Sequence, residues 1–304
     1  MKGGRWDSMS TDEQVNRALQ WYRARDNSPV VDIFQTQLRS TLQCQHCGHQ
    51  SLSFEPCWEV RQRRHRAGSI PPHYPAFSCI SLRDASAHRL ACLWARSTEG
   101  PCVSRSDFFP FFPISFWCLQ CDVIPDSTFD QVSLPIPGGT GRKYGAKTAG
   151  VTLEACFEEF TKKEKLEHVN CDNCKKKRTQ AKGMSLQILP EILVLHLVRF
   201  DQTGRFSTKI TSSVQCPVEG LSVDRFCAGQ SNGRGIPLRY DLFAVAEHDG
   251  RMGFGHCTAS CGHPEDAERW FRYNDCQVTP SRKAVTVTGA IPYLLFYRRR
   301  ETAR

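Results

Sequence analysis

Three pairs of cysteines, each separated by two residues, constrain this fold more than any other feature of the sequence. The pairs are Cys44/Cys47, Cys118/Cys121 and Cys171/Cys174, out of sixteen cysteines in all. The opening stretch, "MKGGRWDSMS", lacks the apolar run of a secretory signal, which argues against a disulfide framework. Paired thiols in a reducing compartment are typical of zinc sites, so we expect a zinc-binding protein of the cytoplasm or nucleus. The alternative is that these are simply free cysteines.

The first and last pairs are the better zinc ligands. Gly48 follows the first pair and tolerates the positive φ that such knuckles often need. The last pair adds two thiolates, which completes the tetrahedral set of a closed structural site. We therefore predict one structural zinc ion held by Cys44, Cys47, Cys171 and Cys174. The middle pair is weaker because its surroundings lack periodicity, although it could compete for metal.

Length, composition and charge set outer limits on the protein class. The 304 residues could form one large domain or two ordinary ones, and 40% apolar and 23% charged residues are ordinary for a globular protein. No stretch approaches the roughly 20 apolar residues of a membrane span, so no membrane partner is expected. The net charge of +9 is partly concentrated in "CKKKR" and "RQRRHR". Such runs can attract nucleic acid or act as nuclear addresses, but they are more often solvated loops.

Hydrophobic periodicity predicts helices early and strands late. Apolar residues at helical spacing run through "TDEQVNRALQWYRARDN", and residues 151–168 are expected to form a second amphipathic helix. A buried strand is expected from Ile192 to Phe200, after Pro190. The segments "LRYDLFAVAEHDG", "GFGHCTASC", "WFRYNDCQVTP" and "YLLFYRR" are then expected as strands. The C-terminal part should therefore form a largely antiparallel sheet, and the chain an α+β fold.

Two of these strands bring a histidine and an asparagine into register. His256 and Asn274 each lie nine residues from Glu265, and Glu265 falls in the turn-like stretch "GHPEDAER". A β-hairpin would set them opposite or nearly opposite, with Cβ atoms roughly 5 Å apart. A histidine oriented by an amide usually serves a nucleophile. The alternative, more common for a lone histidine on a strand, is a packed residue.

The stretch from 60 to 131 interrupts the regular patterning. It contains 72 residues, including "RQRRHRAGSIPPHYP" and "FFPFFPISFWCLQC", neither of which makes an amphipathic element. Phe, Pro, Ser and Leu codons are pyrimidine-rich, and the codons of Val60, Arg61 and Gln131 can hold splice-site sequences. We hypothesise that 60–131 is a retained intron whose removal would join Glu59 to Val132. The alternative is a genuine surface insertion, since long loops are thermodynamically tolerated.

Several segments on either side of this stretch carry a family resemblance. In chain order they are "DIFQTQLRSTLQCQHCGHQSLSFEPCWEV", "SLPIP", "FEEFTKKEKL", "CDNCKKK", "LPEILVLHLVRF", "GFGHCTASC", "WFRYNDCQV" and "YLLFYRR". Together they resemble the ubiquitin-specific proteases, cysteine peptidases that remove ubiquitin, over about residues 20–59 and 132–299. The resemblance implies a papain-like fold with a palm and with zinc-ribbon fingers that cradle ubiquitin. It also implies ubiquitin and ubiquitinated proteins as partners.

The resemblance implies roles for the residues of the hairpin. His256 matches the general base, Asn274 the residue that holds its tautomer, and Asp275 the adjacent auxiliary acid. Cys257 and Ser260 replace aromatic residues that are usual in the histidine box, which weakens the expected clamp on the substrate tail. His196 also falls in a family motif and is expected to be structural, because its strand is apolar on both sides.

The nucleophile is the missing part. The family's catalytic cysteine lies in a Gly-Asn-Thr-Cys sequence, followed by a box rich in Gln and Asp, and neither occurs in this sequence. Strand alternation turns Cys257 away from His256. We therefore expect no nucleophile and no turnover from residues 1–304, together with exposed apolar surface on the palm. Other cysteines outside the pairs also lack the family context, including Cys57, Cys156, Cys216, Cys227, Cys261 and Cys276.

These inferences divide the chain as follows. Residues 1–304 are expected to be a partial catalytic domain without the N-terminal thumb part, with fingers at 40–59 and 132–182 and the palm at 183–299. The expected function is that of a deubiquitinase-family protein, inactive as this chain. The alternative is a non-catalytic ubiquitin-binding protein. A basic zinc ribbon that binds nucleic acid ranks behind both, because the aromatic residues are not interleaved with the charges.

Overall fold

The structure is a computed structural model that describes only part of the chain. The described residues are 6, 8–25, 29–56, 131–138, 150–201, 208–228, 238–251, 254–263, 266, 268–275, 277–282 and 291–300. Cys57, Cys118, Cys121 and Cys276 lie outside them, as does the hypothesised intron apart from Gln131. Within these ranges, no helix is both long and apolar enough to cross a membrane.

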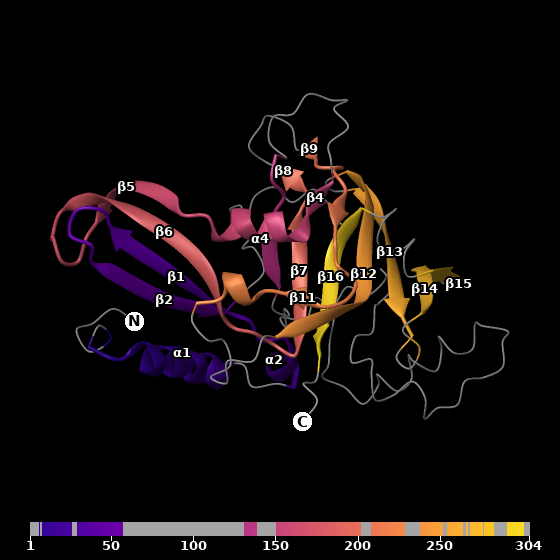
Figure 1. Ribbon diagram of the computed structural model, residues 1–304, viewed down its shortest axis with the longest axis horizontal. Coiled ribbons are helices and arrows are strands. Elements are labelled where there is room, and N and C mark those ends of the chain that lie inside the picture. The colour runs from indigo at the N-terminus through magenta and orange to yellow at the C-terminus, as the bar shows by residue number, and fades with distance from the viewer. Residues whose placement is uncertain are drawn as a thin grey trace, which may run out of the picture.

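Two large sheets, two small two-stranded sheets and a few helices make up the described part of the fold. Figure 1 shows a narrow sheet, the fingers, extending to one side of a larger sheet, the palm. The helices are α1 (Thr11–Arg25), α2 (Pro29–Phe34), α4 (Leu153–Thr161) and the 3-10 turn η1 (Asp224–Phe226). The strands are β1 (Gln37–Cys44), β2 (Gln50–Pro56), β3 (Val132–Pro135), β4 (Val151–Thr152), β5 (Glu164–Asn170), β6 (Lys177–Ile188), β7 (Ile192–Val198), β8 (Phe200–Asp201), β9 (Thr208–Lys209), β10 (Val214–Gln215), β11 (Leu221–Ser222), β12 (Arg239–Arg251), β13 (Phe254–Gly262), β14 (Arg269–Asn274), β15 (Gln277–Arg282) and β16 (Pro292–Arg299).

The fingers are a four-stranded antiparallel sheet in the order β2-β1-β6-β5. Helix α1 packs against β2, where Val15 and Ala18 meet Phe54 in a small buried cluster. The hairpins β1–β2 and β5–β6 both turn at the far end of the sheet (Figure 1). The pairs Cys44/Cys47 and Cys171/Cys174 lie at these turns.

The palm is an eight-stranded sheet in the order β15-β14-β13-β12-β16-β7-β3, with β11 paired to β12. Every pairing is antiparallel except β3 with β7, which confirms the largely antiparallel C-terminal sheet. Helix α4 covers one face, where Phe157, Leu134 and Leu195 are fully buried. On the other face, Phe34 of α2 packs against Ile192 and Val194. Burial of this apolar surface is the main stabilising contribution to the palm.

The prediction of one helix over 151–168 was wrong in its C-terminal half. Helix α4 begins after Thr152, whose side-chain oxygen caps the helix by accepting from the Ala155 N–H, and it ends at Thr161. Lys162 is extended, and residues 164–170 instead form β5, paired with β6. Sheet hydrogen bonds to a neighbouring strand outweighed the helical propensity of the Glu, Lys and Leu residues in this segment, because tertiary contacts routinely override propensity.

The predicted boundaries between fingers and palm also need correction. Residues 132–182 were assigned to the fingers, but β3 and α4 belong to the palm, because Val132 and Leu134 are fully buried beside β7. The fingers also begin earlier than residue 40, since β1 starts at Gln37. The long strand β6 continues from the fingers towards the palm and joins the two sheets (Figure 1).

The exposed apolar surface expected on the palm is not seen in the part of the chain that the structure describes. There, Trp21 of α1, with 43% of its surface exposed, is the only exposed large hydrophobic residue. The apolar residues of both palm faces lie in buried clusters.

Candidate functional site: a four-cysteine cluster and a His–Asn pair

Two matching knuckles at the fingertip carry the cysteine pairs. In the first, the Gly48 N–H donates to the carbonyl of Cys44 at 3.0 Å, and in the second the Lys175 N–H donates to that of Cys171 at 2.8 Å. The residue after each pair has a positive φ, +71° for Gly48 and +55° for Lys175. The expectation for Gly48 is therefore confirmed, and Lys175 adopts the same left-handed conformation despite its side chain.

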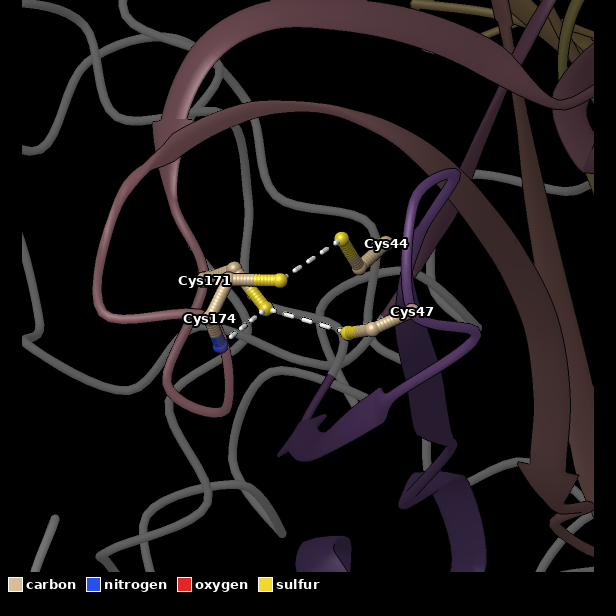
Figure 2. A group of neighbouring side chains, drawn as sticks. All are labelled: Cys44, Cys47, Cys171 and Cys174. Atoms are coloured by element: carbon tan, nitrogen blue, oxygen red, sulfur yellow. Dashed lines mark hydrogen bonds between the residues drawn. The ribbon is translucent and has the colours of Figure 1, made fainter.

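The four thiols converge on one another, as Figure 2 shows. Their sulfur atoms lie within 4.8 Å of one another, with 4.0 Å between Cys44 and Cys174 and 3.6 Å between Cys47 and Cys171. A tetrahedral zinc ion with Zn–S bonds of about 2.3 Å needs sulfur atoms about 3.8 Å apart. The cluster therefore fits a metal ion bound by four cysteines.

Hydrogen bonds shift the pKa values of two of these thiols in opposite directions. The backbone of His49 and the side chain of Asn173 lower the pKa of Cys47 to about 6. The hydrogen bond between Cys47 and Cys174 is the largest of several causes that raise the pKa of Cys174 to about 12. The Cys47 thiolate thus forms readily while Cys174 keeps its proton, and a bound cation would favour loss of that proton.

The second candidate site lies on the hairpin formed by β13 and β14. Ala259 pairs with Tyr273, and continuing this register sets Asn274 against Thr258, two residues from His256. His256 and Asn274 are therefore diagonal neighbours on one face rather than directly opposite residues. Their side chains meet, with Nε2 of His256 2.5 Å from Oδ1 of Asn274.

This contact determines which imidazole nitrogen can act as a base. The amide oxygen of Asn274 only accepts hydrogen bonds, so Nε2 of His256 carries the proton and donates it. In the neutral ring the lone pair then lies on Nδ1. Asp275, which has a φ of +51°, brings a carboxylate oxygen to 3.9 Å from Nε2. An imidazolium at His256 would gain a modest attraction from this exposed acid.

The described cysteines outside the cluster do not approach His256. Cys257 pairs across the sheet with His248, whereas His256 pairs with Asp249, so alternation turns Cys257 to the other face as predicted. None of the described cysteines lies within hydrogen-bonding distance of His256. Burial raises the pKa of Cys156 to about 11 and those of Cys216 and Cys261 to about 12, which keeps these thiols protonated and unreactive.

His196 has the environment of a structural residue. Its Nδ1 is 3.0 Å from the hydroxyl oxygen of Ser133, and its ring meets the Tyr293 ring edge to face. Burial lowers the pKa of His196 to about 4. The residue is therefore neutral at physiological pH.

The sequence also matches a known protein family. The protein-family model described as "Ubiquitin carboxyl-terminal hydrolase" matches residues 9–297. The chain belongs to the ubiquitin carboxyl-terminal hydrolase family. The resemblance inferred from the sequence is thereby confirmed, and the fold is of the ubiquitin-specific protease type.

Relatives in this hydrolase family match almost the whole chain. Ubiquitin carboxyl-terminal hydrolase 21 of Homo sapiens is 28% identical over 293 residues, which cover 95% of this chain and 37% of that protein. Hydrolase 2 of Gallus gallus is 29% identical over 294 residues, which cover 96% of this chain and 58% of that protein. This chain therefore spans less than two thirds of either relative.

Solved structures agree on the fold. The SAGA Ubp8/Sgf11/Sus1/Sgf73 DUB module bound to ubiquitin aldehyde matches with a TM-score of 0.57 and 18% identity, covering 96% of this chain and 48% of that one. The same module bound to monoubiquitin matches with a TM-score of 0.55. At this identity the likeness shows the hydrolase fold alone.

The sequence did not reveal two groups of residues that lie near the hairpin of β13 and β14. On the His256 face, the Thr258 hydroxyl donates to Glu247 at 3.2 Å, and Arg272 contacts both residues. Their same-face positions were a usable signal once the register was known. The second group centres on Arg199, a charged residue that directly follows the apolar run of β7. A charge at such a position is itself a signal, because buried charges are costly unless their polar atoms are satisfied.

Proposed function

We propose that residues 1–304 form the base-bearing part of a deubiquitinase, in which His256 is the general base. Asn274 orients the imidazole and Asp275 stabilises its charged form. The hydrogen bond between Nε2 of His256 and Asn274 is the observation that carries this proposal. It lies on the hairpin that resembles the family's histidine box, in a chain that belongs to the family.

The proposed chemistry uses the free nitrogen of His256. Nδ1 accepts a proton from a cysteine thiol, and the thiolate attacks the carbonyl carbon of the ubiquitin C-terminal glycine. The imidazolium then protonates the leaving amine, and water hydrolyses the acyl-enzyme. Because none of the described cysteines approaches His256, we propose that residues 1–304 do not catalyse this reaction unaided.

The four-cysteine cluster is proposed to hold a single structural zinc ion. All-thiolate donors and sulfur spacings close to those of a tetrahedral ion support zinc over harder cations such as magnesium or calcium. The bound ion would cross-link the two fingertip hairpins and would take no part in the reaction. The donors favour a reducing compartment, which supports a cytoplasmic or nuclear protein.

Ubiquitin is the proposed partner of the fingers and palm. The solved DUB module of similar fold is bound to ubiquitin aldehyde, which supports the same class of partner here. A non-catalytic ubiquitin-binding protein is the alternative. Both proposals predict ubiquitin binding by residues 1–304, so binding alone does not separate them.

A restored nucleophile tests the base role directly. Residues 1–304 should bind ¹⁵N-labelled ubiquitin and leave ubiquitin-aminocoumarin uncleaved. Joined to the Gly-Asn-Thr-Cys segment of a family relative, the chain should cleave this substrate. His256→Ala should then lower kcat by about 10²–10⁴-fold. The matched control is His263→Ala, because His263 follows the same strand and contacts Phe271 rather than Asn274.

Each arm has a result that would contradict the proposal. Cleavage by residues 1–304 alone would reveal a nucleophile within the chain. A joined protein that cleaves equally well with and without His256 would remove that residue from the reaction. Binding without cleavage in a well-folded joined protein would favour the non-catalytic alternative.

A further inference from the structure

Arg199, between β7 and β8, is an arginine with no exposed surface. Its Nε donates to the carbonyl of Pro292 at 2.6 Å, and one terminal nitrogen donates to those of Ile210 at 2.9 Å and Ser212 at 3.0 Å. No ion pair to a carboxylate is found for it within the described part of the chain. A planar fork of donors suits such a set of fixed carbonyls, so Arg199 joins the start of β16 to the segment after β9.

The residues beside Arg199 hold His248 of β12. Phe200 pairs with Lys209 in the small β8–β9 hairpin, and the Arg199 carbonyl accepts from the Ile210 N–H at 2.7 Å. From this hairpin, Nζ of Lys209 donates to the carbonyl of His248 at 2.6 Å. The Phe200 ring meets the His248 ring in a T-shaped contact, with centroids 5.5 Å apart.

Tyr293 holds the same histidine from a second segment. It follows Pro292, which Arg199 anchors, and its ring centroid lies 5.9 Å from that of His248 and 6.3 Å from that of Phe200. The His248 ring thus contacts aromatic residues from two segments that the Arg199 guanidinium connects. We name the set of Arg199, Phe200, Lys209, His248 and Tyr293 the arginine clamp.

The clamp reaches the residue before His256. A Cβ added to Gly255 would lie 2.2 Å from Nε2 and 2.6 Å from Cε1 of His248. The imidazole therefore occupies the space directly against the Gly255 backbone. Because Gly255 and His256 are consecutive in β13, a shift of His248 would change the path of the strand where His256 projects.

We propose that Arg199 is a positioning residue for His256, acting through His248 and Gly255. The guanidinium sets the relative position of the β8–β9 hairpin and the start of β16. These hold the His248 ring, and the ring fixes the backbone at Gly255, so that Nε2 of His256 meets Asn274. The relevance to catalysis rests on the proposed function, whereas the positioning itself does not.

The test reads the His256 ring directly by long-range ¹H–¹⁵N NMR on the full chain. The parent protein should show His256 as one neutral tautomer with the proton on Nε2. Arg199→Met should convert this into a mixture of tautomers. Arg199→Lys should behave like Arg199→Met, because one ammonium group lacks the planar fork. Where Arg199→Met fails to fold, Phe200→Leu carries the same expectation, since it removes only the ring against His248.

The matched control separates positioning from loss of stability. The hydroxyl of Tyr297 in β16 donates a partly buried hydrogen bond to the carbonyl of Pro217 at 2.8 Å, so Tyr297→Phe destabilises the same strand without touching the clamp. His256 should keep its single tautomer in this variant. A folded Arg199→Met protein with a single Nε2–H tautomer would overturn the proposal, as would equal disturbance by Tyr297→Phe. The two proposals can also fail separately. If Arg199→Met disturbs the tautomer but cleavage by the joined protein does not depend on His256, the positioning role of Arg199 stands and the base role of His256 is refuted.

Discussion

The cluster at the fingertip joins segments far apart in the chain, whereas the pair on the palm comes from a single hairpin. Cys44 and Cys174 are 130 positions apart, and His256 and Asn274 are 18 apart. A site closed over a long loop depends on the ordering of both hairpins, and a bound ion can contribute that order. A site within one hairpin depends on register instead. Disturbing either one should leave the other intact.

Loss of the proposed metal ligands should have the largest effect, confined to the fingers. Replacing Cys171 and Cys174 with Ser removes half of the donor set, and structural zinc contributes about 10–16 kcal/mol in small zinc domains. We expect the amides of β1, β5 and β6 to lose hydrogen-exchange protection while those of β12 and β13 keep it. Cys227→Ser, a cysteine outside the cluster, is the control. Protection lost equally in both sheets would contradict the separation of the two sites.

A methyl group should act oppositely in the two sheets. At Gly255 the added Cβ would lie 2.2 Å from His248 and 2.5 Å from the Asp249 carbonyl oxygen, so Gly255→Ala should destabilise by about 3 kcal/mol. At Gly183 in β6 the nearest atom is Cγ of Lys163 at 3.5 Å, and Gly183→Ala should stabilise by about 0.5 kcal/mol. Urea unfolding measures both changes. Equal effects would show that β13 is no more tightly packed at Gly255 than the fingers at Gly183.

The difference between the sites also explains what the sequence could predict. The cysteine spacing predicted the four thiols that converge in the cluster, because each pair forms its own local knuckle. The hairpin was predictable from alternation, but its register was not, since two residues of offset leave the pattern of faces unchanged. Helix α4 was overextended into β5 because strand pairing is a long-range effect. The partners of Arg199 were out of reach for the same reason.

Acid should destabilise the palm through His196. Burial lowers the pKa of His196 to about 4 in the folded state, against 6.5 for the ordinary group. Between these values the unfolded chain binds more protons, so stability is full above pH 6.5 and falls as the pH drops towards 4. The loss should reach about 3 kcal/mol across this window. Urea unfolding from pH 7.5 to 4.5 measures it, and the difference between the parent and His196→Gln isolates this residue. An unchanged slope in the variant would assign the acid sensitivity elsewhere.

A small effect should come from Lys175, the position at which the backbone conformation strains one knuckle and not the other. Lys175 has the left-handed conformation that Gly48 adopts without cost, and this conformation disfavours side chains by roughly 1–2 kcal/mol. Lys175→Gly should therefore stabilise the fingers by about 1 kcal/mol after the added entropy of glycine in the unfolded chain is included. Gly48→Lys should destabilise them by a similar amount, and the double exchange should be nearly neutral. Unfolding of the metal-bound protein by urea measures all three. If Lys175→Gly instead destabilises, the lysine side chain contributes more at the fingertip than its backbone strain costs.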